Sequence, residues 1–422
     1  MNNATPQSTL VSVVMPSLNQ VAFIEGSIRS VLSQVNVELE LIIMDGGSTD
    51  GTQAVLSRLS REAKGRMRWY SGADNGPAQA VNRAMVMARG DVIGWLNADD
   101  IYMPGAVERA VVALAAQPEW LMLYGNAHHI DACGQFIGDY PTRRPETPVQ
   151  RFADGCFICQ PTVFLRKELI HNVGMLDEGL SSAFDLDWWL RIFSQYPTAI
   201  GFIDTIQACS RLHDACITVS RRETSIREGM QVLAKYLGTC PLHWFKTYMN
   251  EVLETYPHGQ QIKDIKAHLN KFGRSISGYL SDIDRQELRD VLKNDARIRL
   301  ALADVCLEIY PDAWLPVRSS LRVRRDKHAW RRIEIHALHV AKGDEPLQIK
   351  IYSPDGKDLL HCVEARGTFK LDVPLPPASV FPSYWTFAIE VEGGFVPRLC
   401  DEESTDDREL ACQINKIRLL KN

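Results

Sequence analysis

Polar and acidic residues follow four apolar segments in the first 100 residues of this sequence, close to the point where each segment ends. These clusters are Pro16-Ser17-Leu18-Asn19, Asp45 to Gly51, Asp74-Asn75-Gly76 and Asn97-Ala98-Asp99-Asp100. The apolar segments have the length and composition of buried β-strands, and in open α/β sheets ligands bind beyond the carboxyl ends of the strands. We therefore expect the four clusters to meet at one edge of a sheet and to form a polar binding site.

The pair Asp99 and Asp100 could hold a divalent cation. Carboxylates directly after an apolar strand suit Mg²⁺ or Mn²⁺, because these ions prefer oxygen ligands and keep coordination positions open for phosphate. A turn that caps the helix after Met103-Pro104-Gly105 explains the same pair without any ligand. The stretch from Asp45 to Gly51 also has two interpretations. It could bind a ligand, or its Asp, Ser and Gly residues could form turns and cap the helix expected near Thr52.

The stretch from Phe184 to Arg191 predicts a helix whose core-facing residues are Leu186, Trp189, Leu190 and Phe193. Asp187 and Arg191 are spaced i,i+4, which favours an ion pair on the helix surface. Asp185 lies at the start of the helix, where it is either a cap or a carboxylate that takes a proton from a hydroxyl group. His213 is a candidate imidazole ligand, although a lone histidine is more often structural.

Short β-rich runs alternate with amphipathic helical patterns in the first half of the chain. The expected strands are Val11–Met15, Leu39–Met44, Arg68–Tyr70, Val92–Leu96 and Trp120–Tyr124. This alternation predicts an α/β fold with a mostly parallel sheet covered by helices. There is no GxGxxG motif after the first strand and no GxxxxGKS or GxxxxGKT motif. The sequence therefore does not favour a dinucleotide-binding site or a P-loop site.

The second half of the chain changes its pattern twice. It is helical from about residue 224, and after Trp330 the apolar period becomes two, which predicts a small β-sandwich with Trp385 in its core. We expect three parts, an α/β domain over 9–223, a helical segment over 224–320 and a β-sandwich over 321–422. Seven basic residues between Arg318 and Arg332 are expected to be solvated, although they could also attract an anionic membrane surface.

The composition argues against several classes of protein. The 422 residues carry a net charge of −5, so the chain lacks the positive surplus that binding nucleic acid requires. The N-terminus is polar and no apolar run is long enough to span a membrane, so we expect a cytoplasmic protein, either free or at the inner face of the membrane. The ten cysteines are expected to be reduced, and only Cys156 and Cys159 have zinc or redox spacing.

Five segments, in this order, resemble the family 2 glycosyltransferases of the GT-A fold over about Val11 to Ser220. VSVVMPSLNQ is similar to the opening strand of that family, LIIMDGGSTDGT to its second strand and DNGPAQAVNRAM to its nucleotide-side helix. GWLNADDIYMPGA is similar to its D-x-D region and FDLDWWLRI to its E-D-x-D-x-W-L-R helix. Each segment is weak evidence alone, whereas the five in sequence are highly specific. The resemblance implies a GT-A domain and an inverting single displacement.

The resemblance also implies a role for each candidate residue. The nucleoside of a donor would contact Pro16, Ser17, Asn19, Asp45 and Asp74. The diphosphate and its bridging cation would be bound around the D-x-D region, at Asn97, Asp99, Asp100 and His213. Asp185 would be the general base that deprotonates the acceptor hydroxyl.

Three positions depart from the pattern of the family. Asn97 stands in place of the leading Asp of D-x-D, which lowers the negative charge and would weaken metal binding. Gly46 stands where many members carry a second Asp that contacts uracil, which leaves the identity of the base open. Phe184 replaces the Glu before the base, and an apolar neighbour should raise the pKa of Asp185 by desolvation.

The activity implied by this resemblance is that of a metal-dependent glycosyltransferase of hexosyltransferase type. It would move a sugar from a nucleoside diphosphate donor, expected to be UDP-linked, to a hydroxyl of a glycan or glycoconjugate during polysaccharide biosynthesis, with Mn²⁺ or Mg²⁺ as cofactor. The C-terminal part could bind glycan, dock a partner or form a homo-oligomer. The alternative is a catalytically inactive sugar- or nucleotide-binding protein on the same fold, which Asn97 and Gly46 would suit.

Overall fold

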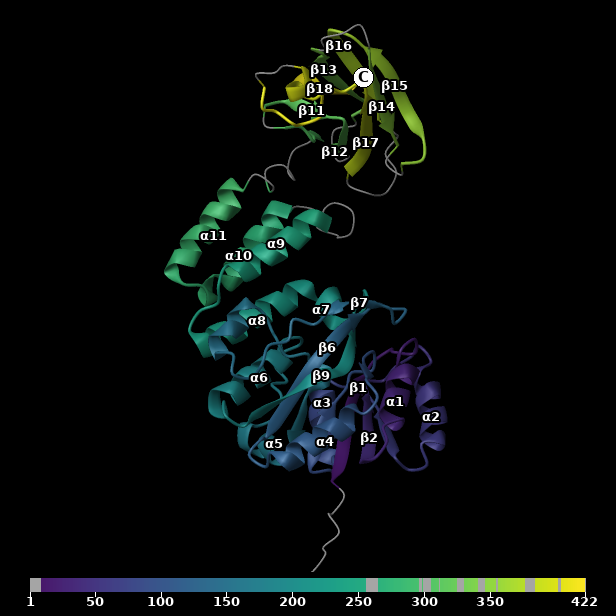
Figure 1. Cartoon of the computed structure of the whole chain (residues 1–422), viewed down its shortest axis with the longest axis vertical. Helices are drawn as coiled ribbons and strands as arrows, with labels where there is room; N and C mark the ends of the chain where they lie inside the picture. The colour runs from purple at the N-terminus through teal and green to yellow at the C-terminus, as the bar shows by residue number, and fades with distance from the viewer. Residues whose placement is uncertain are drawn as a thin grey trace, which may run out of the picture. The chain divides into compact units, whose positions relative to one another are not determined.

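The computed structural model describes residues 9–255, 265–295, 298, 305–310, 312–324, 330–340, 346–353, 356–375, 384–400 and 404–421. They form two compact units (Figure 1). The N-terminal unit comprises the described residues up to Tyr248 together with 274–285, and the C-terminal unit comprises the rest.

A mixed sheet forms the centre of the N-terminal unit. Its strands run in the order β3-β2-β1-β4-β8-β6-β9-β5, with β7 paired to β6. The bounds are β1 Leu10–Ser17, β2 Glu38–Asp45, β3 Met67–Ser71, β4 Val92–Trp95, β5 Ile101–Tyr102, β6 Met122–Ile130, β7 Phe136–Asp139, β8 Phe164–Arg166 and β9 Ile200–Arg211. The first four strands are parallel to one another, as the sequence predicts.

The sheet is less uniformly parallel than the sequence indicates. β8 is antiparallel to both β4 and β6, and the chain then returns to a parallel pairing between β6 and β9. β8 has only three residues, Phe164 to Arg166, which is too short to show a periodic pattern in the sequence. This antiparallel insertion brings the segment just before β8, residues 160–162, against the end of β4.

Helices join the strands of this sheet, and two more follow its last strand. They are α1 Ile24–Leu32, α2 Thr52–Glu62, α3 Pro77–Met87, α4 Ala106–Ala116, α5 Lys167–Val173, α6 Phe184–Gln195, α7 Ile217–Ser220 and α8 Arg222–Leu237. α3 begins with Pro77 after Gly76, whose φ of 126° is one that a side chain would strain. The central strands β1, β2 and β4 are almost fully buried, so the polar groups that follow them are held by a rigid core.

The C-terminal unit contains two antiparallel sheets. One sheet has the order β10-β12-β17-β14-β15 and the other β11-β18-β13-β16. The bounds are β10 Val305–Leu307, β11 Trp314–Pro316, β12 Arg318–Arg324, β13 Arg332–Leu338, β14 Leu347–Tyr352, β15 Leu359–Ala365, β16 Thr368–Pro374, β17 Tyr384–Glu392 and β18 Leu410–Leu420. The inward residues of both sheets, including Trp385, share one hydrophobic core, which confirms the predicted sandwich.

The remaining helices are α9 His243–Thr255, α10 Ile265–Ile276, α11 Asp282–Asn294 and α13 Pro397–Cys400. Phe245, Met249 and Val252 of α9 are buried, and the helical pattern that the sequence shows from about residue 224 is confirmed for this helix. Of the predicted basic stretch between Arg318 and Arg332, residues 325–329 lie outside the described part of the chain. In the described part, no helix combines the length and the apolar character that crossing a membrane requires.

Candidate active site

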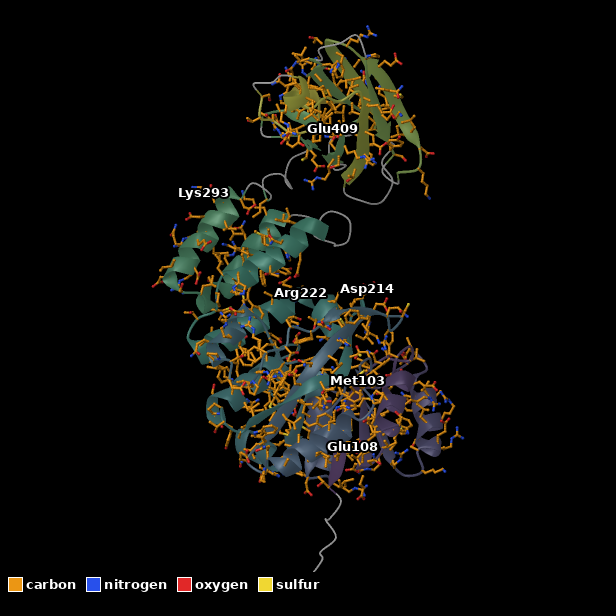
Figure 2. The ribbon with its side chains drawn as sticks, in the orientation of Figure 1. Met103, Glu108, Asp214, Arg222, Lys293 and Glu409 are labelled. Carbon is orange, nitrogen blue, oxygen red and sulfur yellow. The ribbon has the colours of Figure 1, made fainter. Side chains whose placement is uncertain are left out.

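A cleft of about 350 Å³ lies in the N-terminal unit at the carboxyl ends of β1 and β4. Most of the side chains singled out in the sequence line it, namely Pro16, Ser17, Asp74, Asn97, Asp99, Asp100 and Asp185. Trp95, Gln160 and Phe184 also line it, and a further part of its wall comes from the end of β9 and the stretch up to α8, where Figure 2 labels Asp214 and Arg222. The structure therefore brings acidic residues from distant parts of the chain, including Asp74, Asp99 and Asp185, to one cavity.

Asp45 and Asn19 do not line the cleft, but they hold its wall in place. Asp45 is buried, and its carboxylate accepts hydrogen bonds from the Ser48 amide at 3.0 Å and from the Ser71 hydroxyl at 2.6 Å. The Asn19 amide donates to the Ser48 hydroxyl at 2.7 Å, and the Asn19 side chain accepts from Thr49 at 2.9 Å. These contacts tie together the loops that follow β1, β2 and β3.

Gly46 and Asp74 occupy one small space. A Cβ atom at position 46 would lie 3.0 Å from Oδ2 of Asp74, closer than side chains normally approach. The other oxygen, Oδ1 of Asp74, accepts a hydrogen bond from the Gly76 amide at 2.9 Å. The absence of a side chain at position 46 therefore lets Asp74 reach this part of the wall, and a second carboxylate there would meet the first.

Asp99 and His213 form the polar pair best suited to a cation. Nε2 of His213 lies 3.1 Å from Oδ2 of Asp99, and both side chains are largely buried. The His213 ring packs on Phe23, with ring centroids 4.6 Å apart, and Arg211 donates to the backbone carbonyl of Asp99 at 2.8 Å. The pair is thus fixed from both sides.

These two side chains suit a metal ion that takes some of its ligands from the protein and the others from the phosphates of the substrate. Within the described ranges, no group of three or more His, Cys, Asp or Glu side chains is arranged to hold a metal ion by itself. Mg²⁺ and Mn²⁺ are often bound by one or two protein ligands together with substrate phosphates. Asp99 lines the cleft, whereas His213 does not line it and contacts Asp99 from behind, so this carboxylate and imidazole could supply one or two protein ligands.

Both carboxylate oxygens of Asp100 accept hydrogen bonds from within the protein. Its Oδ1 accepts from the Arg211 amide at 2.8 Å and its Oδ2 from the Asn97 side chain at 3.2 Å. Burial raises the pKa of Asp100 well above its usual range, and the negative charge of Asp99 adds to this effect. Asp100 therefore braces β9 against the end of β4.

Asp185 lies in the first turn of α6 and faces the cleft. Burial raises the pKa of its carboxyl to about 6, and the hydrogen bond from the Leu186 amide, at 2.7 Å, partly opposes this shift. The preceding residue, Phe184, is buried and stacks on Trp95 with ring centroids 5.9 Å apart. The direction of the pKa shift is the one expected from an apolar residue at position 184, and a carboxylate with this pKa can accept a proton near neutral pH.

Glu228 of α8 holds the start of α6, a role that sequence patterns did not indicate. Its buried carboxylate accepts hydrogen bonds from the backbone amides of Ser181, Ser182 and Ala183, and from the Ser181 hydroxyl at 2.7 Å. These amides precede the helix that carries Asp185, and the first amides of a helix have no partner within it. Glu228 therefore supplies the missing cap from another helix.

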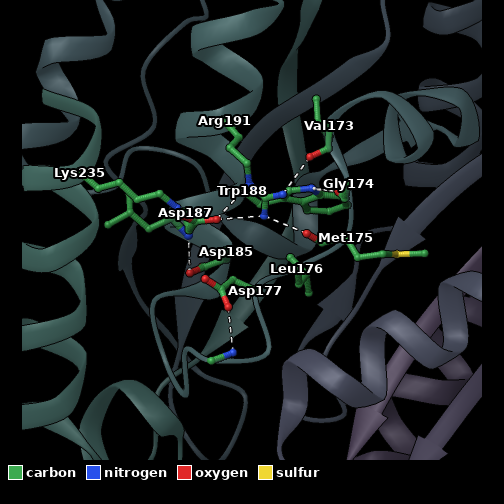
Figure 3. Close-up of polar contacts among 12 residues, drawn as sticks. Val173, Gly174, Met175, Leu176, Asp177, Asp185, Asp187, Trp188, Arg191 and Lys235 are labelled. Atoms are coloured by element: carbon green, nitrogen blue, oxygen red, sulfur yellow. Dashed lines mark hydrogen bonds and ion pairs between the residues drawn. The ribbon is translucent and has the colours of Figure 1, made fainter.

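The ion pair of Asp187 with Arg191 is present but buried, so its predicted place on the helix surface is wrong. The Asp187 side chain is 1% exposed and accepts from Arg191 at 2.9 Å and from Lys235 of α8 at 2.8 Å (Figure 3). Arg191 also donates to the carbonyls of Val173 and Met175, each at 2.9 Å. Because α8 covers this face of α6, the pair links α6 to α8 and to the end of α5.

Cys156 and Cys159 form no disulfide and are poor candidates for thiolate chemistry. Burial raises the pKa of Cys156 to about 12 and that of Cys159 well above its usual range. A zinc or redox site needs thiolates, which form readily only at lowered pKa. These two cysteines therefore belong to the packing behind the cleft.

Comparison with known proteins agrees with this geometry. Residues 12–174 match the family model of glycosyl transferase family 2. An uncharacterized glycosyltransferase of Rickettsia conorii is 24% identical over 58% of this chain and 39% of that protein, and the chondroitin synthase of Pasteurella multocida is 32% identical over 43% of this chain and 19% of that protein. The chain spans well under half the length of these two relatives. S. aureus TarS 1–349, solved with UDP-GlcNAc, gives a TM-score of 0.48 at 15% identity, over 75% of this chain and 97% of that one.

The family match over residues 12–174 and the sequence relatives show a similarity to family 2 glycosyltransferases, the family that the five sequence motifs resemble. The fold class is confirmed as a GT-A type mixed sheet with helices, followed by two antiparallel sheets.

Proposed function

We propose that this protein is an inverting glycosyltransferase that moves a sugar from a nucleoside diphosphate to a hydroxyl of a glycan or glycoconjugate. The observation that carries the proposal is the shared cleft of Asp74, Asp99 and Asp185, in which burial raises the pKa of Asp185 to about 6. Asp74 and Asp99 suit a nucleotide with its cation, and the raised pKa of Asp185 suits proton abstraction.

The donor would lie along the carboxyl ends of β1 and β4. Pro16, Ser17 and Asp74 would contact the nucleoside, within the wall that Asp45 and Asn19 brace. Asp99 and His213 would hold Mn²⁺ or Mg²⁺, which would neutralise the charge that grows on the leaving diphosphate. Arg221, exposed at the rim of the same cleft, offers a further positive charge to the phosphates.

Asp185 would act on the acceptor. Its carboxylate takes the proton of the attacking hydroxyl while the oxygen of that hydroxyl bonds to the anomeric carbon. The bond from that carbon to the diphosphate oxygen breaks on the opposite face, and the nucleoside diphosphate leaves with the electron pair. Attack opposite to the leaving group inverts the anomeric centre. The burial that raises the pKa of Asp185 makes its carboxylate a stronger base than one in water.

The biological setting extends this proposal. Similar proteins include an O-antigen biosynthesis protein of Myxococcus xanthus and a chondroitin synthase, which favours a polysaccharide or a related glycoconjugate as the product. We place the reaction in the cytoplasm, where nucleotide sugars would be the donors, with the helical segment and the β-sandwich outside the catalytic domain of residues 9–223. The sandwich would bind glycan or a second copy of the chain.

The test is a panel of UDP- and GDP-linked hexoses, N-acetylhexosamines and hexuronic acids, incubated with the protein and Mn²⁺ or Mg²⁺. Calorimetry measures binding, and a coupled assay measures release of nucleoside diphosphate. We expect one donor to bind and to be slowly hydrolysed, and Asp185→Asn to bind it with similar affinity while release falls by about 10²- to 10⁴-fold. Binding without release by the unsubstituted protein would favour the inactive, sugar-binding alternative.

A further inference from the structure

Gln160 is the buried side chain of the cleft whose hydrogen bonding is half complete. It lies in the 3₁₀ turn Gln160–Thr162, just before β8 in sequence and against β4, β6 and β9, and it is 8% exposed. Its Nε2 donates to the backbone carbonyl of Trp95 at 2.6 Å. Gln160 lines the cleft, and its Oε1 is buried and has no hydrogen-bond partner in the structure.

The contact with Trp95 fixes which way the amide of Gln160 is turned. A backbone carbonyl only accepts hydrogen bonds, so the NH₂ group must face Trp95 and the Oε1 atom must face away from it. Buried acceptors are almost always paired, because an unpaired one loses its hydration without compensation. A fixed, unpaired oxygen on the wall of a cleft therefore indicates a hydrogen-bond donor on the ligand that fills the cleft.

Trp95 also places Gln160 relative to the chemistry. The indole of Trp95 donates to Oδ1 of Asn97 at 3.0 Å, on the diphosphate side of the cleft, and its ring stacks on Phe184, next to Asp185. Trp95 therefore contacts Gln160, Asn97 and Phe184, which places Gln160 in the part of the cleft that it shares with Asn97 and Asp185. The part of a bound donor that lies between its diphosphate and the general base is the transferred sugar.

We propose that Oε1 of Gln160 accepts a hydrogen bond from a hydroxyl or an amide N–H of the transferred sugar and so helps to select that sugar. This inference rests on the proposed function. A neutral acceptor beside Asp100 and Asp185 favours a neutral hexose or N-acetylhexosamine, because the carboxylate of a hexuronic acid would bring only acceptors and negative charge to the same place. Discrimination between epimers would come from the hydroxyl that reaches Gln160.

Two substitutions separate the role of Oε1 from the role of the contact with Trp95. Gln160→Leu removes both the donor and the acceptor of the side chain. Gln160→Glu keeps the shape, and burial favours its protonated form, whose O–H can donate to Trp95 while the carbonyl oxygen stays in the place of Oε1. Thermal unfolding of both variants and of the unsubstituted protein shows which of them are folded.

Calorimetry with UDP alone and with UDP-glucose, UDP-galactose, UDP-GlcNAc and UDP-GalNAc, each in Mn²⁺, tests the proposal. We expect Gln160→Leu to bind UDP as the unsubstituted protein does, to bind the preferred nucleotide sugar about tenfold more weakly, and to lose preference between its epimers. Gln160→Glu should restore most of that affinity. An unchanged ratio of UDP-sugar to UDP affinity in Gln160→Leu would show that Gln160 is only structural. Failure of the unsubstituted protein to bind any nucleotide sugar would instead overturn the proposed function.

Discussion

Glu228 and Ser181 are joined through both the backbone and the side chain of Ser181. The Glu228 carboxylate accepts from the Ser181 amide at 3.0 and 3.1 Å and from its hydroxyl at 2.7 Å, across 47 residues of sequence. Because the next two amides also point to this carboxylate, one side chain of α8 fixes the entry to α6. The position of Asp185 therefore depends on a residue that has no contact with the substrate in the proposed mechanism.

We expect Glu228→Ala to act on catalysis through this positioning. Three backbone amides would lose their acceptor, which should lower the free energy of unfolding by about 3 kcal/mol. The kcat for release of nucleoside diphosphate should fall at least about tenfold while the donor KM changes little, because the donor contacts lie elsewhere. Glu223→Gln, on the same helix, is the control. Equal losses in kcat and in donor affinity would contradict a positioning role.

The pKa of Asp185 predicts the pH dependence of activity. A general base must be deprotonated, so kcat/KM should fall about tenfold per pH unit below about 6 and level off above it. The profile of nucleoside diphosphate release against pH, measured between pH 5 and 8 with the donor found in the panel, checks this expectation. A profile that stays flat down to pH 5 would remove Asp185 as the base.

The same pKa predicts that Asp185→Asn is more stable than the unsubstituted protein at neutral pH. Burial raises the pKa from 3.8 to about 6, so folding favours the protonated carboxyl. The resulting stability is fully present below about pH 4 and is lost as the pH rises through about 6, which amounts to about 3 kcal/mol for a shift of about two units. Asparagine stays neutral and avoids this loss. Denaturant unfolding at pH 4 and pH 7.5 should show a gain only at the higher pH.

Asp99 and His213 provide the prediction on metal binding. Asp99→Ala and His213→Ala should each weaken Mn²⁺-dependent binding of UDP by at least about tenfold, because each removes one of only two protein ligands. A matched control is Asp139→Ala, since Asp139 forms a similar contact with His128, at 2.7 Å, outside the cleft. Titration of Mn²⁺ against UDP affinity is the measurement. Equal metal dependence in all three variants would remove the pair as the cation site.

The sequence predicted the parts of the site that follow strands. Asp74, Asp99 and Asp100 come directly after or shortly after apolar runs, and the geometry of parallel sheets then places them at one edge. Asp185 was found because it begins a helix with a clear apolar face. Patterns of this kind involve residues that are close in the sequence, so they can be recognised without the tertiary structure.

Other parts of the site depend on contacts between distant residues. Gln160 is hydrogen-bonded to Trp95, 65 residues away in the sequence, and Glu228 to Ser181, 47 residues away. Neither contact produces a recognisable pattern among neighbouring residues. The spacing of Asp187 and Arg191 predicted their ion pair, but it could not predict that α8 covers that face of α6 and buries the pair. The antiparallel β8 was missed because three residues are too few to show a period.

The network around Asp187 gives the last prediction, which concerns stability. Asp187→Ala should lower the free energy of unfolding by about 3 kcal/mol, since it removes the buried carboxylate that accepts from the partly buried Arg191 and from the exposed Lys235. Asp154→Ala breaks exposed ion pairs with Arg143 and Arg151 and should cost no more than about 1 kcal/mol. Comparison of the two variants by denaturant unfolding separates burial from charge. If both variants lost the same small amount, the link between α6 and α8 would contribute little, and the restraint on Asp185 would have to come from Glu228.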